Sequence, residues 1–548
     1  MIKDREKLQK LLSKVKEAES GGVSKSLKNS ILSKKATSRK GIEESFGLME
    51  RNAVDMKIIR GLCANGIPFN VLRNPQFIEM LNALKKALEG YKPPSSEKAR
   101  TVLLDECMRD VEKDLTQVKD IWYTQGVSIV SDGWSNVKHK PLINVLAVNA
   151  CGSMFMYAED FSGVEKTGVE ISKYLLGAID EVGPSNVLQV VTDNAANCKA
   201  AGREVEKLLR VAKTRFASHY ILFKRIKDCR EALATTIVLN SWREWLKNGD
   251  ENTKVLGLKV ADTIKDDLFW EDVDNVLAIT KPIFLLIKFC DGEGPKMGEI
   301  YEKMDNMLGE IKDIMQENTY SSYYPEVEKI VLARWEKMTI PLHCLGFALT
   351  PRFYDRQYLQ KLAPGGIPRK APNLDKEVVI GVMKAFHRMS ENEEEEQVLR
   401  EQFATFHMKK GIYSMAATQT DAVTMDAIDW WSTYGAETPE LAVIAKKVLS
   451  QPISSSSAER NWSTYSYIHN VKRNRLNCKR ADKLVFIHSN IRLLSRFSDS
   501  YKAGPYKKWD MNPENTYIEG SSSRLEEMFW ENLDEDMENG QRKRQRVD

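Results

Sequence analysis

Two aspartates each end an apolar stretch that has the pattern of a buried β-strand. Residues 126–132 place β-branched side chains before Asp132, and residues 187–193 repeat this pattern before Asp193. Carboxylates held at the ends of neighbouring strands can share a divalent cation, because hard cations prefer rigidly held oxygen ligands. Asp is also a common turn or capping residue after a strand. The spacing alone leaves both interpretations open.

The elements around the two aspartates predict a small α/β segment. The apolar patterns indicate three strands at 126–132, 142–150 and 154–160, followed by a helix at 168–182. A fourth strand at 187–192 and a helix at 198–209 complete the segment. Three meandering strands, a crossover helix and a fourth strand form the opening order of a ribonuclease-H-like fold. In that fold the acids on the first and fourth strands meet. We therefore expect one sheet to position Asp132 and Asp193.

The composition is that of an ordinary soluble protein of several domains. The chain has 548 residues, of which 42% are hydrophobic and 29% charged. No run of eighteen apolar residues occurs, so we expect no membrane span. The eight cysteines include no CxxC pair. This fits free thiols in a reducing compartment and argues against a zinc finger.

Positive charge is concentrated in two places, although the net charge is only +4. Residues 1–40 carry twelve Lys or Arg against four Asp or Glu, and residues 459–480 carry six against one. Such runs are suited to contact the phosphates of DNA. The alternative is that they are simply solvated charge. A short basic cluster at 542–546 is typical of a nuclear import signal, with the same alternative.

Several motifs, taken together and in order, resemble those of plant hAT-superfamily transposase-like proteins. They are Asn65–Arg73, Ser131–Ser135, Val191–Ala195, Thr214–Ser218, Trp430–Gly435, Leu449–Ser463 and Lys472–Leu476. Each motif is weak alone, but the set spans about residues 46–496.

This resemblance implies an α/β ribonuclease-H-like core that is interrupted by a large all-α insertion and followed by a helical dimerisation region. The expected parts are a basic flexible arm (1–45), a helical N-terminal region (46–125), the first part of the core (126–212), the all-α insertion (213–424), a dimerisation region that completes the core (425–496), and a disordered acidic and basic tail (497–548).

The resemblance also implies a catalytic triad, Asp132, Asp193 and Glu459, holding two Mg²⁺ or Mn²⁺ ions for DNA strand transfer. Glu459 follows a serine run that can cap a helix, so it should lie on that helix's first turn. A Glu there is also favoured by the helix dipole, which is the structural alternative. Residues expected to contact DNA are Arg215, Phe216, Lys472, Arg473, Arg475, Lys479 and Arg480. Phe216 stands where the family often has a tryptophan implicated in stacking on DNA.

Self-association, with a second copy or with related hAT-like proteins, is the partner interaction that the resemblance implies. Apolar helical faces and nearby aromatics are its candidates: Trp430, Trp431, Leu441, Ile444, Val448, Leu449, Trp462, Leu484, Ile487 and Ile491. The alternative is that these faces pack on the chain's own core, as most amphipathic helices do.

Two departures from the family pattern argue against transposition. The chain has no BED-type zinc finger, and the segment between Asp193 and Thr214 is too short for the further core strand and the Cys-x-x-His pair found in the family. We therefore expect an incomplete core and a nuclear, DNA-binding, self-associating protein without transposition activity. An active transposase that relies on a partner for end recognition, and a degenerate product without a selected function, are the alternatives.

Overall fold

The computed structural model describes residues 52–67, 69–87, 90–136, 138–163, 167–192, 217–316, 320–469, 476–503 and 509. The chain divides into two compact units, one formed by residues 1–89 with 509–517 and the other by 90–508 with 518–548. The expectations for the arm at 1–45, the helix at 198–209 and the cluster at 542–546 lie outside the described residues. Within the described part, no helix is long and apolar enough to cross a membrane.

The described part of the first unit is helical, as predicted. Residues 52–65 form a helix that ends at Gly66, where φ is 61°. A short 3-10 helix, Phe69–Arg73, precedes α3, Pro75–Lys86. The Asn74 side chain accepts a hydrogen bond from the Gln76 amide at 2.9 Å and so caps α3. The predicted region 46–125 is therefore divided, because its later helices belong to the second unit.

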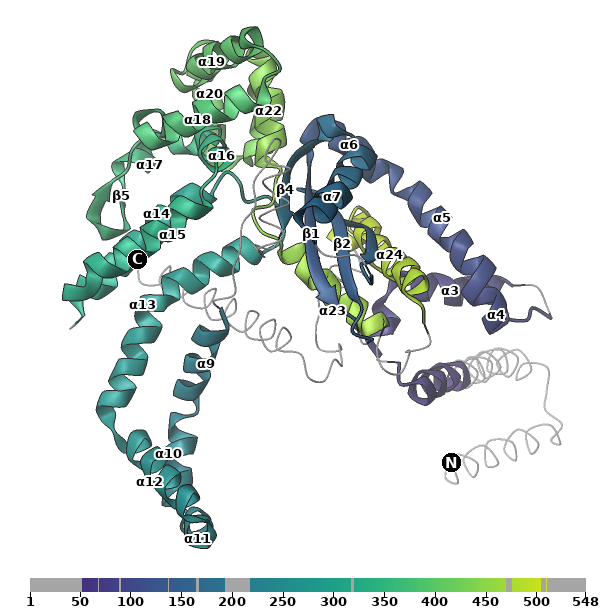
Figure 1. The fold of residues 1–548 in the computed structure, drawn as a ribbon. Coiled ribbons are helices and arrows are strands. Elements are labelled where there is room, and N and C mark those ends of the chain that lie inside the picture. The colour runs from purple at the N-terminus through teal and green to yellow at the C-terminus, as the bar shows by residue number, and fades with distance from the viewer. Residues whose placement is uncertain are drawn as a thin grey trace, which may run out of the picture. The chain divides into compact units, whose positions relative to one another are not determined.

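A four-stranded mixed sheet lies at the centre of one core of the second unit (Figure 1). Its strands are β1 (Val127–Ser135), β2 (Pro141–Asn149), β3 (Gly152–Asp160) and β4 (Val187–Thr192). The order is β3-β2-β1-β4, with β1 antiparallel to β2 and parallel to β4. Helix α7, Gly168–Val182, makes the crossover between β3 and β4. The predicted strands and crossover helix are confirmed, whereas the ribonuclease-H-like assignment stays a prediction.

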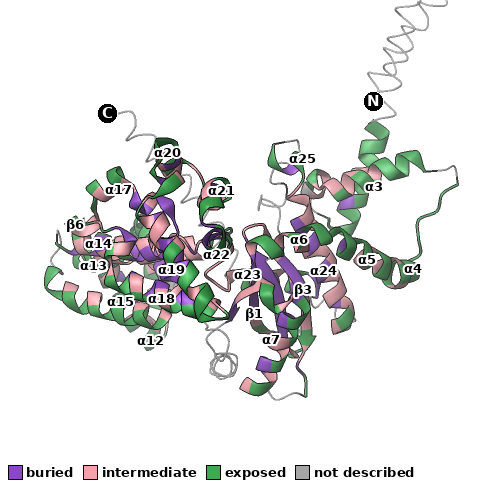
Figure 2. Ribbon diagram, turned by 90° about the horizontal axis from the view of Figure 1, so that it is seen from above, coloured by how far each residue is buried: buried purple, intermediate pink, exposed green. Residues whose placement is uncertain are grey.

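Helices from both ends of the second unit cover this sheet. They are α5 (Leu104–Asp114), α6 (Thr116–Gln125), α7, α23 (Ser456–Ile468) and α24 (Cys478–Ser495). The short helix α4 (Ser96–Lys98) precedes α5 along the chain, and its residues are exposed. The first five residues of β1 and all of β2 after Pro141 are buried, as expected for strands covered on both faces (Figure 2). One hydrophobic cluster joins Val111, Ile129 and Phe155 to Trp462 and Val485. Residues 456–495 therefore complete the core begun at 104.

Helix α24 closes the outer edge of the sheet with side chains instead of another strand. The buried Asn490 amide accepts a hydrogen bond from the Phe155 amide at 3.0 Å and donates one to the Phe155 carbonyl at 2.8 Å. Asp482, about two turns nearer the start of α24, accepts a hydrogen bond from the Ala158 amide at 2.7 Å. An edge strand exposes unpaired backbone groups, so these contacts satisfy groups of β3 that have no neighbouring strand.

The insertion is helical, as predicted. Its helices are α9 (Ala217–Asp228), α10 (Arg230–Val238), α11 (Asn240–Asn248), α12 (Glu251–Lys265), α13 (Asp267–Asp291), α14 (Ile300–Gln316), α15 (Tyr324–Met338), α16 (Pro341–Ala348), α17 (Arg356–Gln360), α18 (Lys376–Met389), α19 (Glu393–His407) and α20 (Ala416–Thr424). Residues Pro364–Gly366 form a tight turn between two-residue strands, β5 (Leu362–Ala363) and β6 (Ile367–Pro368). Such short strands are too brief to show an alternating pattern.

A second hydrophobic core lies in the helical part. It contains α16, α18, the end of α19, α21 (Ala427–Tyr434) and α22 (Pro439–Leu449). The predicted unit 425–496 is therefore shared between two cores, with α21 and α22 in the helical core and α23 and α24 in the sheet core.

The contact between α24 and β3 predicts a pH-dependent stability. Burial raises the pKa of Asp482 to about 7, although the hydrogen bond from the Ala158 amide lowers it. Because the folded state then binds more protons than the unfolded state between about pH 4 and 7, the free energy of unfolding should fall as pH rises through this range. The Asp482→Asn variant keeps the acceptor oxygen and should lose this dependence.

Chemical unfolding at a series of pH values measures this difference. Asp120→Asn, at an exposed position of α6, is the control and should keep the wild-type pH profile. Parallel pH profiles for wild type and Asp482→Asn would show that Asp482 does not titrate in this range.

Candidate functional site

Asp132 lies near the end of β1, and its side chain is partly buried. In the sheet register it pairs with Asn144 of β2, while Ser131 pairs with Thr192 at the end of β4. Within the described residues, the parallel pairing of β1 and β4 thus reaches the residue before each of the two aspartates. Asp193 itself lies outside the described residues, so its predicted meeting with Asp132 stays a prediction.

Glu459 lies in the first turn of α23, and its side chain is exposed. The helix starts at Ser456, whose amide donates a hydrogen bond to the Ser454 hydroxyl at 3.3 Å. The prediction of a helix that follows the serine run and carries Glu459 on its first turn is confirmed. The capping interaction comes from Ser454, since the side chain of Ser455, at the N-cap position, makes no capping hydrogen bond.

The Asn144 side chain connects the two elements that carry Asp132 and Glu459. Asn144 is fully buried. Its Oδ1 accepts a hydrogen bond from the Asp132 amide at 2.9 Å, and its Nδ2 donates to the Ala458 carbonyl at 3.0 Å. A single amide therefore ties the backbone at Asp132 to the residue before Glu459. A lone asparagine inside the apolar stretch 142–148 was the sequence signal for this role, and our sequence reasoning missed it.

Aromatic stacking strengthens the same connection. The rings of Trp134 on β1 and Trp462 on α23 are stacked with centroids 5.4 Å apart, and Tyr465 meets Trp134 edge-on at 6.0 Å. Such pairs add to the stability that the buried area itself provides.

A buried polar network joins the connection before α23 to the sheet. Gln451 accepts a hydrogen bond from the Ser128 hydroxyl at 2.8 Å. Gln189 of β4 donates to the same hydroxyl at 3.0 Å and to the Pro452 carbonyl at 2.8 Å. Because each of these buried groups has a partner, the network fixes where the segment between α22 and α23 lies.

The described residues do not by themselves form a metal centre. Among them, no group of three or more His, Cys, Asp or Glu side chains could hold a metal ion. Of the predicted triad, the described part supplies Asp132 and Glu459. A site for Mg²⁺ or Mn²⁺ would depend on Asp193 as the third carboxylate.

Two of the predicted DNA-contacting residues are described. Lys479 is exposed and Arg480 is partly buried, both in the first turn of α24. The Asn477 side chain caps this helix by accepting a hydrogen bond from the Arg480 amide at 2.9 Å. Arg215, Phe216, Lys472, Arg473 and Arg475 lie outside the described residues.

The side chains predicted to mediate dimerisation are largely used by the chain's own cores. Trp430, Trp431, Leu441, Val448 and Leu449 are buried in the helical core, and Trp462 is buried in the sheet core. The other four, Ile444, Leu484, Ile487 and Ile491, are partly buried and pack against these cores. In the single chain these side chains therefore pack on its own cores, which is the alternative that the sequence left open, and their part in self-association stays a prediction. Helical periodicity shows that a face must be covered, but not by which chain.

Both tryptophans of the Trp430–Trp431 pair also have their polar groups satisfied internally. The Trp431 indole donates a hydrogen bond to the Leu349 carbonyl at 2.7 Å, and the Trp430 indole donates to the Thr418 carbonyl at 3.0 Å. These bonds confirm that the pair belongs to the interior of the helical core.

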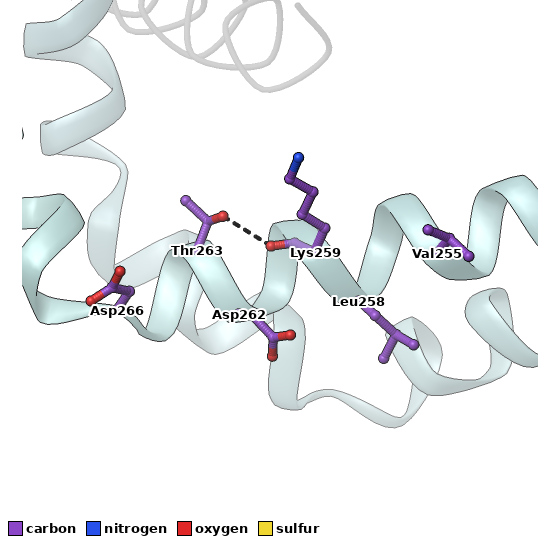
Figure 3. A pocket seen from close by; sticks show the side chains of 6 residues that line it. All are labelled: Val255, Leu258, Lys259, Asp262, Thr263 and Asp266. Atoms are coloured by element: carbon purple, nitrogen blue, oxygen red, sulfur yellow. Dashed lines mark hydrogen bonds between the residues drawn. The ribbon is translucent and has the colours of Figure 1, made fainter.

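An open surface hollow lies along α12 of the insertion (Figure 3). Its lining residues are Val255, Leu258, Lys259, Asp262, Thr263 and Asp266. The Thr263 hydroxyl donates to the Lys259 carbonyl at 2.9 Å, which is a bond within the helix. The hollow contains none of the predicted site residues, and a single helix lines it, so we assign it no chemistry.

The connection through Asn144 predicts a local effect of mutation. Asn144→Ala leaves the Asp132 amide and the Ala458 carbonyl without their buried partner, which should cost about 2–4 kcal/mol of stability. Hydrogen exchange across 456–468 should rise, because α23 loses its hydrogen bond to the sheet. The control is Asn149→Ala, another buried asparagine of β2, which bonds to Gly126 and Cys151 instead. Equal acceleration of α23 in both variants would contradict a specific role of Asn144.

Two known protein families match segments of this chain, and each segment includes one of the two parts of the sheet core. Residues 94–240 match the model of a domain of unknown function (DUF659), and residues 406–491 match that of the hAT family C-terminal dimerisation region. No curated protein significantly matches the chain. The second match begins earlier than the predicted boundary at 425 and takes in the end of α19 and all of α20. The two matches together support a relationship of this chain to the hAT-like transposases.

Proposed function

We propose that this protein is a self-associating, hAT transposase-like nuclear protein that binds DNA through the phosphate backbone and does not transpose. One observation carries the proposal. Helices α23 and α24, from the match to the hAT dimerisation region, pack on the sheet from the DUF659 match and form one hydrophobic core with it. The two segments thus behave as parts of one domain, although the insertion separates them in sequence.

DNA binding is proposed to centre on the start of α24 and the basic segment before it. Lys479 and Arg480 place two cations at a helix N-terminus, where the helix dipole also favours anions. Lys472, Arg473 and Arg475 precede them in sequence, and the arm at 1–40 adds further positive charge. Arg215 and Phe216 are proposed to add a phosphate contact and a ring that can stack on a base. Such contacts hold DNA without reading its sequence.

The salt dependence of DNA binding tests this surface. In the double variant Lys479→Ala with Arg480→Ala, affinity for a duplex should fall, and the slope of log K against log salt should become shallower by about 1 to 2, as expected for two lost phosphate contacts. Fluorescence anisotropy at several salt concentrations measures both quantities. The matched control, Arg334→Ala with Lys337→Ala, removes two exposed cations from α15. An unchanged slope in the α24 variant, or a sharp preference for one duplex sequence, would contradict the proposal.

A metal-dependent strand-transfer activity is the second candidate. Asn144 favours it, because this residue holds Asp132 and the start of α23 to each other. Asp132, Asp193 and Glu459 would hold Mg²⁺ or Mn²⁺, and the ions would supply charge stabilisation for phosphodiester cleavage. End recognition would then have to come from a partner subunit.

Calorimetric titration with Mn²⁺ tests the carboxylates separately from activity. If they hold a metal, Asp132→Asn should weaken Mn²⁺ binding at least about tenfold, which corresponds to 1.4 kcal/mol. Asp110→Asn, which changes an exposed carboxylate on α5, is the control and should bind like wild type. Equal affinity of wild type and Asp132→Asn would rule out this site. Binding without nicking of supercoiled DNA would support the inactive assignment.

Nuclear localisation is proposed from the basic cluster Arg542–Arg546 together with the family relationship. A fluorescent fusion that lacks residues 541–548 should lose nuclear accumulation. Retention in the nucleus would show that import does not depend on this cluster.

A further inference from the structure

The matched dimerisation region has few large apolar side chains left for a second chain. Within 406–491, the large hydrophobic residues that the structure describes as exposed are Met408, Met415, Val423, Val443 and Tyr467. Met415 is the N-cap residue of a single short helix, α20, and Val423 lies in its last turn. Met408 precedes Lys409, whose ammonium group lies 3.4 Å from Gln419 on the same helix. Three of the five therefore belong to one part of the helical core.

The outer face of α20 carries no charge. Its exposed residues are Ala416, Ala417, Thr420, Val423 and Thr424. The single charged residue of the helix, Asp421, is partly buried and accepts a hydrogen bond from the Tyr434 hydroxyl. A helix that faces water usually carries charged residues on its outer side, so this face is unlike an ordinary solvated surface.

The inner side of α20 holds the outer face in a fixed position. Thr418 is buried, and its carbonyl accepts the hydrogen bond from the Trp430 indole. Gln419 donates to the Tyr413 carbonyl at 3.4 Å, and Ala422 packs on the helical core. A rigidly held face loses little conformational entropy when it binds, which favours association.

We propose that the outer face of α20, extended by Met415 and Met408, is the contact through which two copies of this chain associate. The inference rests on the proposed self-association and names the surface for it. A second copy is the occupant because the face lies within the match to a dimerisation region, whose other large apolar residues are mostly buried in the chain's own cores.

The chemistry of the face fits a symmetric pair. In a twofold dimer the same patch meets itself, so an uncharged patch avoids like-charge repulsion. Alanine and threonine side chains let two helices approach closely, and Val423 and Met415 supply apolar area. A stable interface buries about 800 Å² on each partner, which is more than a nine-residue helix offers, so the methionines at its margin are needed as well.

Sedimentation velocity over a range of micromolar concentrations tests this surface. Val423 is 53% exposed and Val443, on α22 in the same matched region, is 46% exposed, so Val443→Glu is a matched control. Wild type and Val443→Glu should associate equally. Val423→Glu should raise the dissociation constant at least about tenfold, because it places a carboxylate in an apolar contact. Thr420→Arg, on the same face, should have a similar effect.

Circular dichroism checks that each variant is folded, which we expect because glutamate and arginine are both better helix formers than the residues they replace. If wild type associates but neither Val423→Glu nor Thr420→Arg changes the dissociation constant, the proposed surface is wrong and self-association stands. If Val443→Glu weakens association as much as Val423→Glu, the contact is not confined to α20 and the proposal fails. If wild type is monomeric throughout, both the surface and the proposed self-association are wrong.

Discussion

The docking of α23 and α24 on the sheet is the interaction on which the sheet core depends. Asn144 reaches the Ala458 carbonyl across 314 residues of sequence, and Asn490 reaches Phe155 across 335. Without these helices, the edge of β3 and the inner side of Trp134 would face water. The entropic cost of closing a loop increases only slowly with the length of the loop. A large insertion between the two parts of one core is therefore thermodynamically tolerable.

The polar groups at this contact specify one arrangement in addition to stabilising it. Asn144, Asn490 and Gln451 are all fully buried, and each bonds to backbone or side-chain groups of an element distant in sequence. An apolar contact tolerates sliding, whereas a buried amide that loses its partner costs free energy. A shift of α23 or α24 by one turn would break several of these bonds together. The position of Glu459 relative to Asp132 is therefore set by residues with no catalytic chemistry of their own.

The region matched to the hAT dimerisation model contributes helices to both hydrophobic cores, so its two halves can serve different functions. Its second half, α23 and α24, completes the sheet core, and its first half, from the end of α19 to α22, lies in the helical core. Two of the proposed DNA-contacting cations, Lys479 and Arg480, lie in the second half, on α24, whereas the proposed contact between copies lies in the first half, on α20. Association and DNA binding would then use different elements, so each can be altered by mutation without removing the other.

By itself the sequence determined that four strands, the crossover helix and the helix carrying Glu459 exist, because apolar periodicity and capping residues are local signals. It predicted the strands at 126–132, 142–150, 154–160 and 187–192, whereas the structure has the first three at 127–135, 141–149 and 152–160. It also pointed to the hAT relationship through motifs such as Trp430–Gly435 and Leu449–Ser463. Only the tertiary structure decided what each apolar face touches. Trp431 and Leu441 have the pattern of an interface but face their own core, whereas α20, a weakly patterned helix, presents the uncharged surface. The role of Asn144 was likewise hidden, because its partners lie on a neighbouring strand and on a helix 314 residues away. The sequence pattern indicates that a side chain must be buried or hydrogen-bonded. Which residue is its partner depends on how the whole chain folds.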